Sequence, residues 1–347
     1  MNEIIFKYLG WLRENNQYRD IFVRTKIRLI RNVADFPFPK QANNIKKKVF
    51  LNRIEWLLKN SDVFDGFNLI SFDKTSSKIK YLFLEKGFLN KDLKEDGRGI
   101  LVNKKGDLSI LINEDDHFQL QKLSSGFEFE TSFNQLFELE DKLSEYFNFA
   151  FDSQIGYLTS YLENLGFGIR INFWVHLPGL FQEDEISKLV KSFRSSRVQV
   201  KEVYKEEDYP IGNVFEITIN EGLSTKERLT SKVNKIVEKL VTKEKEARNN
   251  LLRERKIIIE DTVYKSLGLI NYSKLLSFRG AWELLFNLRL GSSLNIISIP
   301  LKLIDVLLIF IQPNHIQIRY DKELSSPEME ILRANLLRDV FKSYKIS

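Results

Sequence analysis

The chain of 347 residues contains no cysteine at all. This absence excludes disulfide bonds, thiolate metal sites and cysteine nucleophiles. Histidine is almost as scarce, since only His117, His176 and His315 occur, and they are too scattered along the chain to predict a metal site. The sequence also has no Walker A motif, no dinucleotide-binding fingerprint, no zinc spacing and no Ser-His-Asp arrangement. The common sequence signatures of nucleotide, zinc and hydrolase sites are therefore missing.

The chain also has little net charge and no long apolar run. Its formal charge is +6, with basic and acidic residues interleaved, so we expect no nucleic-acid partner. The most apolar window, 294–311, is broken by Pro300, Lys302 and Asp305, which predicts a buried helix and no membrane span. Charged residues near the N-terminus interrupt the first apolar stretch, so we expect no signal peptide and a cytoplasmic protein.

What the sequence has is a core-forming composition and a change of pattern near residue 222. Hydrophobic residues make up 43% of the chain and 27 residues are phenylalanine, which is typical of a folded globular protein. Alternation predicts strands over 99–102, 108–112, 169–176 and 213–219, and apolar spacing predicts a helix over 130–149. Ser224 and Glu227 predict the capped start of a helix of about thirty residues. Further helices are expected over 257–267, 281–289, 299–311 and 328–343.

These patterns predict an α+β part followed by an all-helical part. We place the first domain at 1–255 and the second at 256–347. The fold class expected from the pattern is therefore α+β with a helical C-terminal domain.

Three polar clusters are candidates for chemistry, and each has an alternative interpretation. Residues 112–120 (INEDDHFQL) place three carboxylates and His117 after a strand, where they indicate either a general base and Mg²⁺ ligands or a solvated acidic turn. Gly166, Gly168 and Arg170 indicate either a phosphate-binding loop or a tight turn with an ion-paired arginine. If 23–32 is extended, Lys26 and Arg28 share one face, which suits an anion site or a plain solvent-facing edge.

The order of these clusters carries more information than any one of them. A strand of the form (I/V)xxRxRLxRN followed by FPFP, then EK, NEEDH, GYLTS, NxGxGxR and HLP resembles the ATP:guanidino phosphotransferase family, and within it the bacterial protein-arginine kinase branch. The matching residues are Arg28, Leu29, Arg31, Asn32, Phe36 to Pro39, Glu85, Lys86, Asn113, Glu114, Asp116, His117, Gly156 to Ser160, Asn164, Gly166, Gly168, Arg170, His176, Leu177 and Pro178.

The resemblance implies a fold and partners. It implies an antiparallel sheet flanked by helices, as in phosphagen kinases and glutamine synthetase, that binds ATP with Mg²⁺. It also implies a helical C-terminal domain that forms a homodimer and senses phosphoarginine, with protein substrates and a Clp-type unfoldase and protease as partners.

The resemblance also assigns roles to residues of this chain. It makes Asp115, Glu206 and Glu114 the catalytic carboxylates, with Glu206 placed by counting back from Gly212 without gaps. It gives phosphate or ATP binding to Lys26, Arg28, His117, Gln119, Arg170 and Lys201. It puts Tyr161 where the family has a reactive cysteine, and Glu330 and Arg333 where the branch reads phosphoarginine.

Several of these positions depart from the family pattern. Lysine replaces arginine at Lys26 and Lys201, aspartate replaces glutamate at Asp115, and glutamine replaces arginine at Gln119. Each arginine replacement removes bidentate geometry or a charge that stabilises phosphoryl transfer. Two hypotheses follow: a weak or inactive protein-arginine kinase, or a non-catalytic dimeric adaptor of a Clp-type system.

The two hypotheses share one geometric expectation. The side chains of Lys26, Arg28, Arg170 and Lys201 should line a single cleft. In an active enzyme, Asp115 and Glu206 should also face each other across that cleft.

Overall fold

The computed structural model describes residues 7–13, 16–89, 96–193, 197–206 and 209–342. It contains an eight-stranded sheet with the order β2-β3-β4-β5-β1-β8-β12-β9, in which every neighbouring pair is antiparallel. This confirms the expected antiparallel sheet. The strands are β1 (Phe22–Arg31), β2 (Phe67–Ser71), β3 (Gly99–Asn103), β4 (Leu108–Ile112), β5 (Phe118–Ser124), β8 (Ile169–His176), β9 (Val198–Glu202) and β12 (Val214–Glu221).

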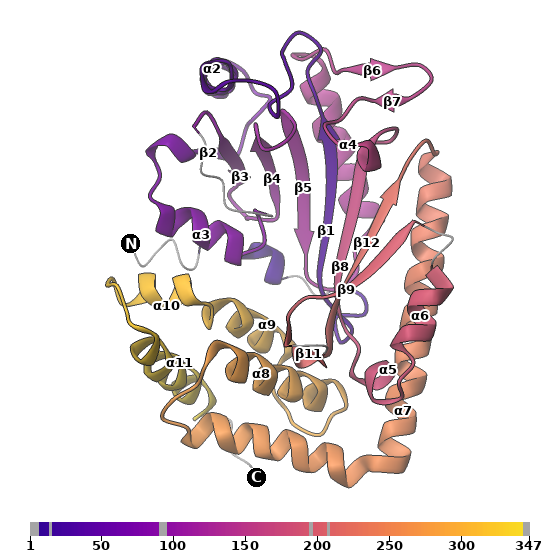
Figure 1. The fold of residues 1–347 in the computed structure, drawn as a ribbon, viewed down its shortest axis with the longest axis vertical. Coiled ribbons are helices and arrows are strands. Elements are labelled where there is room, and N and C mark those ends of the chain that lie inside the picture. The colour runs from indigo at the N-terminus through magenta and orange to yellow at the C-terminus, as the bar shows by residue number, and fades with distance from the viewer. Residues whose placement is uncertain (1–6, 14–15, 90–95, 194–196, 207–208, 343–347) are drawn as a thin grey trace.

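Helices flank this sheet and continue into a helical C-terminal part, which lies below the sheet in Figure 1. Two further ladders of two short strands each lie outside the sheet: β6 (Phe151–Asp152) with β7 (Gly156–Tyr157), and β10 (Lys205–Glu206) with β11 (Tyr209–Pro210). The helices are α2 (Asn44–Asn60), α3 (Ser77–Glu85), α4 (Glu130–Ser144), α5 (Pro178–Gln182), α6 (Ile186–Phe193), α7 (Lys226–Tyr272), α8 (Phe278–Ser293), α9 (Leu301–Phe310), α10 (Pro313–Arg319) and α11 (Ser326–Phe341).

The central strands have one apolar and one polar face. Successive residues of a strand point to opposite sides, so Ile27 and Leu29 of β1 face one way and Lys26 and Arg28 the other. The apolar side is packed into the largest core cluster, together with residues of α2, α4 and α7. Because this core covers one side of the central strands, their other side is left for polar side chains.

Helix α7 differs from the sequence prediction in its start and its length. Its N-cap is Thr225, whose side chain accepts a hydrogen bond from the backbone N–H of Arg228. The predicted start at Ser224 was therefore one residue early. The two helices expected on either side of residue 256 form one helix of 47 residues, with a kink at Arg255. Figure 1 shows α7 running down one edge of the molecule and then turning below the other C-terminal helices.

The helical part shares its packing with the sheet part. One core cluster joins Val23 and Val214 to residues of α7, α8, α9 and α11. Another joins residues of β3, β4 and α3 to residues of α9, α10 and α11. The proposed boundary at 255 therefore falls at a kink inside one helix, and the two parts fold against each other.

Buried charged and polar side chains also connect the two parts, and we call this set the junction: Arg19, Glu85, Arg289, Asp305, His315 and Arg333. Asp305 pairs with Arg19 and with Arg289, each at 3.0 Å. Both Asp305 and Arg289 have no solvent-exposed side-chain surface. The carboxylate of Glu85 accepts hydrogen bonds from the backbone N–H groups of Asn314 and His315 at the start of α10. These contacts fix the first turn of α10 against the end of α3.

The apolar window at 294–311 forms a helix only over its later part, α9. No single helix of the described residues is long and apolar enough to cross a membrane. The bent pair α9 and α10, at 81°, passes the same test by length and composition. Most of α9 is buried against the rest of the chain.

Candidate functional site

The polar face of the sheet carries a row of basic residues on β1. Arg24, Lys26 and Arg28 alternate with Thr25 and Ile27 and therefore point to the same side. The strand register places Trp174 opposite Arg24, Asn172 opposite Lys26 and Arg170 opposite Arg28. Pairing between β1 and β8 thus brings Arg170 beside the cations of β1.

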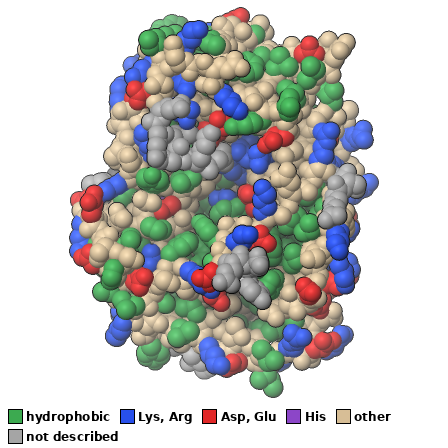
Figure 2. All heavy atoms as spheres, viewed as in Figure 1, with side chains coloured by type: hydrophobic (Ala, Val, Ile, Leu, Met, Phe, Trp, Pro, Cys, Tyr) green, Lys and Arg blue, Asp and Glu red, His purple; other side chains and the backbone are tan. Residues whose placement is uncertain are grey.

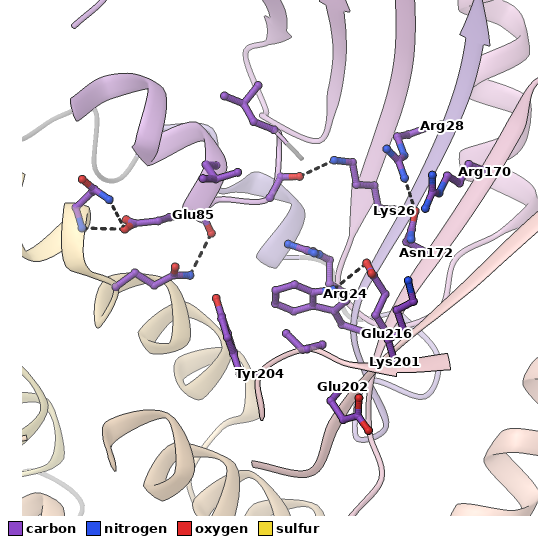
Figure 3. Close-up of a pocket in the computed structure, with 17 residues that line it drawn as sticks. Arg24, Lys26, Arg28, Glu85, Arg170, Asn172, Lys201, Glu202, Tyr204 and Glu216 are labelled. Atoms are coloured by element: carbon purple, nitrogen blue, oxygen red, sulfur yellow. Dashed lines mark hydrogen bonds between the residues drawn. The ribbon is translucent and has the colours of Figure 1, made fainter. Parts of the chain in front are cut away.

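These side chains line a cavity of about 560 Å³, which we call the cationic pocket. Basic side chains gather around a hollow near the middle of the face shown in Figure 2, and Figure 3 shows the labelled residues. The pocket is formed by the sheet, by residues 201–204, by the end of α3 and by the start of α10. Its polar lining consists of Arg24, Lys26, Arg28, Glu85, Arg170, Asn172, Lys201, Glu202, Tyr204, Glu216, Gln312 and Asn314.

The structure therefore brings together the four predicted phosphate-binding cations Lys26, Arg28, Arg170 and Lys201. Burial, and then the neighbouring Arg170, lowers the pKa of Arg28 to about 10. Burial and then Arg28 lower the pKa of Lys26 well below its usual range. Like charges crowded in a buried site favour an anionic ligand.

Lys26 and Arg28 are held by different partners. The Lys26 ammonium donates to the carbonyl oxygens of Gly87 at 2.9 Å and Phe88 at 3.3 Å. The Arg28 guanidinium donates to Asn172 Oδ1 at 2.6 Å, and Asn172 in turn donates to Thr218. The Lys26 side chain is therefore held by backbone carbonyl groups, whereas the Arg28 guanidinium is oriented by the side chain of Asn172.

Several buried polar atoms on this face have no hydrogen-bond partner among the described residues. They include Nε of Arg28 and Nε of Arg170, and also Oε1 of Gln121 and Oδ1 of Asn220. The register places Gln121 and Arg170 on either side of Arg28, and Asn220 next to Arg170. Buried polar groups are normally hydrogen-bonded, so a cluster of unsatisfied ones is typical of a ligand site.

The predicted carboxylates lie elsewhere. Glu114 is buried and raises the pKa of Lys26 and Arg28, opposing the effect of burial. Neither Asp115 nor Glu206 lines the cationic pocket. Glu206 is exposed on β10 and pairs with Arg279 of α8, while Glu202 lines the pocket. The expected arrangement, with Asp115 and Glu206 facing each other across the cleft, is not found among the described residues. The assignment of Glu206 as a catalytic carboxylate stays a prediction.

Two further residues of the NEEDH-like segment have structural partners. The His117 ring contacts Asn32 Oδ1 at 3.0 Å and packs against Phe50. Burial lowers the pKa of His117 to about 4, so the ring is neutral at pH 7. Gln119 is buried on β5 opposite Ile30, outside the pocket lining. Asp116 accepts hydrogen bonds from Asn32 and from the backbone of Ser160, so it joins this segment to the loop at 160.

The loop that carries Tyr161 does not enter the pocket. Tyr161 is 37% exposed, and the Lys40 ammonium lies over its ring at 4.1 Å. Gly166 and Gly168 have positive φ values, and a side chain at either would clash with neighbouring backbone. This supports the tight-turn interpretation of that segment, and Arg170 forms a 3.5 Å pair with Glu163 as that interpretation expects.

The phosphoarginine-like position in α11 is also occupied by internal contacts. Arg333 is buried and donates to the carbonyl oxygens of Ile311 at 2.7 Å and Leu276 at 2.9 Å. Glu330 is half-buried, and its backbone carbonyl accepts from Leu276. Arg333 therefore connects helices in this structure, and a ligand-reading role for Glu330 and Arg333 stays a prediction.

Sequence reasoning missed some pocket residues. Arg24 and Trp174 lie on the predicted strands, so strand alternation was a signal that could have found them. Gln312 and Asn314 come from the helical part, and no local pattern indicates that they reach the sheet. Among the described residues, no group of three or more acidic or histidine side chains is placed to hold a metal ion.

Solved structures show the fold class. The duplicated taurocyamine kinase from Schistosoma mansoni with bound transition state analog components aligns with a TM-score of 0.56 and 21% identity, over 66% of this chain and 35% of that one. A lombricine kinase aligns with a TM-score of 0.56 and 19% identity, over 67% of this chain and 68% of that one. The sheet and its helices therefore have the phosphagen kinase fold.

Sequence comparisons define the family more closely. Residues 50–247 match the ATP:guanido phosphotransferase C-terminal catalytic domain, and residues 256–346 match the protein-arginine kinase McsB C-terminal domain. The protein-arginine kinase of Clostridium acetobutylicum is 30% identical over 336 residues, which is 95% of this chain and 98% of that protein. That of Pelotomaculum thermopropionicum is 28% identical over 97% of this chain and 96% of that protein. The chain belongs to the protein-arginine kinase family.

Proposed function

We propose that this chain binds ATP through the cationic pocket but transfers phosphate to protein arginine side chains weakly or not at all. One observation carries the proposal: Arg28, Arg170 and Lys201 line a single pocket from which Asp115 and Glu206 are both absent. The chain thus retains much of an anion-binding site without the predicted pair of carboxylates. Within its family, this is the arrangement of a pseudokinase.

The pocket has the charge and size for a nucleotide polyphosphate. Its volume of about 560 Å³ falls in the range of small-molecule sites. Arg28 and Arg170 lie directly opposite each other on neighbouring strands, and each has an unpaired buried Nε. An anion between them would relieve their mutual repulsion and satisfy these donors. Mg²⁺, which the family resemblance implies, would bind together with the phosphates.

Transfer makes a further demand that the two assigned carboxylates, Asp115 and Glu206, do not meet in this structure, because neither lines the pocket. A general base must lie within hydrogen-bond reach of the proton it accepts. Glu206 instead pairs with Arg279. Loss of one arginine that stabilises the transition state lowers the rate by about 10³–10⁵-fold. Lys26 and Gln119 stand at two positions where the family resemblance expects arginine, so slow transfer is the expected result.

The test combines binding with a product assay on the purified full chain. We expect titration calorimetry to detect Mg²⁺–ATP binding, which Arg170→Gln weakens and the exposed surface variant Arg253→Gln leaves unchanged. An arginine-rich protein incubated with Mg²⁺–ATP should acquire little acid-labile phosphoarginine. Robust turnover that Asp115→Ala abolishes would overturn the pseudokinase proposal. Absence of ATP binding would overturn the proposal as a whole.

A second candidate, a dimeric adaptor of a Clp-type system, is favoured by exposed apolar side chains on the second half of α7. Ile257 is 80% exposed and Tyr272 is 83% exposed. Ile257 and Tyr264 are seven residues apart, about two helical turns, and so share one side of the helix. Exposed apolar residues gathered on one element are typical of a protein interface.

Light scattering tests this second candidate. We expect a dimer for the natural chain and a monomer for the double variant Ile257→Glu with Tyr264→Glu. The control Lys243→Glu, on the exposed side of the first half of the same helix, should remain dimeric. A monomeric natural chain would rule out this interface.

A further inference from the structure

Arg24 is a basic residue of the cationic pocket that the family pattern does not include. The pattern (I/V)xxRxRLxRN places arginines at the positions of Lys26 and Arg28 and leaves the position of Arg24 unspecified. Arg24 lies two residues before Lys26 on the same face of β1. The chain therefore has lysine at a patterned arginine position and an additional arginine one row further along the same strand.

The neighbours of Arg24 hold its guanidinium in place. The guanidinium carbon lies 3.6 Å from the centre of the Trp174 ring, a distance that suits a cation–π contact. Trp174 is itself fixed, because its indole N–H donates to Glu216 Oε1 at 3.3 Å. On another side Arg24 contacts Gly87, which has φ +85°, and a side chain at Gly87 would collide with Nη1 of Arg24. Arg24 is therefore positioned by shape and stacking.

The N–H groups of Arg24 remain available to a ligand. Within the described residues its guanidinium makes no hydrogen bond and no salt bridge; its contacts are the Trp174 ring and Gly87. Burial lowers the pKa of Arg24 to about 10, and Glu216 and Tyr204 oppose this effect. The side chain is thus a positioned cation at pH 7 whose five donors have no partner in the described parts of the chain.

Lys201 completes the same row across the sheet. The register runs from Arg24 to Trp174, then to Glu216, and then to Lys201 on β9. Lys201 lines the pocket, and its side chain, like that of Arg24, makes no hydrogen bond or ion pair with a described residue. Glu216 is the one carboxylate of this row, and it lies between two cations. The other acidic groups of the pocket are Glu85, which binds α10, and Glu202.

We propose that Arg24, together with Lys201, to which the family resemblance already gives phosphate binding, forms a second anion subsite that binds a phosphoryl group of a polyphosphate ligand. This inference rests on the proposed function, because it takes the ligand of the pocket to be a phosphate chain. Successive rows on one face of a strand are about 6.6 Å apart, so Arg28 and Arg24, which are two rows apart, are separated by about 13 Å along the strand. A ligand that reaches both Arg28 and the row of Arg24 must therefore carry more than one anionic group. Arg24 supplies the bidentate donor that lysine cannot provide at position 26.

The test compares inorganic tripolyphosphate with orthophosphate, using titration calorimetry at fixed ionic strength. We expect Arg24→Ser to weaken tripolyphosphate binding by about tenfold or more, the size expected for a lost hydrogen bond to a charged group. Orthophosphate binding, which needs only one subsite, should change less than threefold. Arg24→Lys should retain part of the affinity, and Arg253→Ser, which removes an exposed charge on α7, should behave like the natural chain.

The variant Lys201→Gln tests the subsite even if substitutions of Arg24 impair folding. Lys201 is exposed on β9, so its replacement leaves the core intact, and tripolyphosphate binding should fall severalfold. Unchanged tripolyphosphate affinity in Lys201→Gln and in Arg24→Lys would overturn the subsite. A thermal unfolding curve for each variant identifies any variant that loses binding because it is unfolded.

The outcomes also separate this inference from the proposed function. If the natural chain binds ATP but neither Arg24 nor Lys201 affects ATP or tripolyphosphate binding, the subsite is wrong and the ATP-binding proposal stands. If tripolyphosphate binding depends on Arg24 while ATP does not bind, the subsite stands and the proposed function falls.

Discussion

The charged groups of the junction and those of the cationic pocket are arranged in opposite ways. In the junction, buried Asp305 lies between Arg19 and Arg289, and each arginine is within 3.0 Å of a carboxylate oxygen. In the pocket, Arg28 faces Arg170 across the strand pair, and each has an unpaired buried Nε. Arg28 of the pocket and Arg19 of the junction are each 7% exposed, so burial alone does not distinguish them.

The difference indicates which charges stabilise the fold and which are available for binding. A buried charge with its partners present stabilises the fold only as a set, and removing one member leaves the others uncompensated. A buried cation without a carboxylate partner, such as Arg28, lowers stability until an anion binds. Arginine occurs in both regions, so the residue type does not distinguish them. The number of carboxylate partners of each arginine does distinguish the structural site from the binding site.

The largest expected effect comes from breaking the junction at Asp305. Asp305→Asn leaves two buried arginines without a countercharge and should lower the free energy of unfolding by about 3–5 kcal/mol. Urea unfolding followed by circular dichroism measures this change. The control Asp339→Asn removes an exposed partner of Lys342 and should cost less than about 1 kcal/mol. Equal losses of stability in the two variants would show that the buried charges of the junction matter no more than an exposed ion pair.

The pH dependence of stability tests the contribution of buried His117 to the fold. The pKa of His117 is lowered to about 4 by burial. The unfolded chain therefore binds a proton at His117 below about pH 6.5 while the folded chain does not. Stability is lost as the pH falls from about 6.5 to 4, by about 3 kcal/mol from this residue. His117→Phe should show a shallower loss over the same range in urea unfolding at several pH values, and an identical slope would contradict it.

The variant Arg333→Met tests whether the arginine at the phosphoarginine-like position is a structural residue in this chain. Arg333→Met leaves the carbonyl oxygens of Ile311 and Leu276 without this donor. We expect a loss of about 2 kcal/mol in the free energy of unfolding and unchanged ATP binding. If stability stays the same and binding of phosphoarginine peptides is lost, Arg333 is a ligand-reading residue and the structural interpretation fails.

Among these variants, Arg28→Met should have the smallest effect on stability. It should have the largest effect on ATP binding. Arg28→Met relieves the repulsion with Arg170 but leaves Asn172 Oδ1 without its donor. The two changes oppose each other, so stability should change by less than about 1 kcal/mol. The affinity for Mg²⁺–ATP should fall at least about tenfold. A loss of several kcal/mol in stability would place Arg28 with the junction residues.

Most of the sheet could be predicted from the sequence because alternation is a local property. The strand expected over 169–176 matches β8, and the strand expected over 108–112 matches β4. The face of β1 that carries Lys26 and Arg28 followed from the same rule. The sequence predicted two helices that meet near Lys256, and the structure joins them into α7 through the kink at Arg255, a continuity that no local pattern indicates.

The candidate site was predictable only where it depends on strand alternation. Lys26, Arg28 and Arg170 lie on strands that pair directly. The position of Glu206 could not be predicted, because β10 pairs with β11 outside the main sheet and Glu206 there meets Arg279 of α8, which is distant in sequence. Gln312 and Asn314 reach the pocket through the packing of α10 on α3 and through Glu85, which no pattern within either segment encodes.

The continuity of α7 has a consequence for insertions and deletions. The segments that match two different families are joined within one helix, with no loop between them to absorb a change of length. Adding or removing one residue near Arg255 would rotate everything beyond it by roughly 100° and shift it by about 1.5 Å. Asp305 would then miss Arg19, and Asn314 would leave the pocket. The spacing between the two segments is therefore constrained as tightly as the residues that line the pocket.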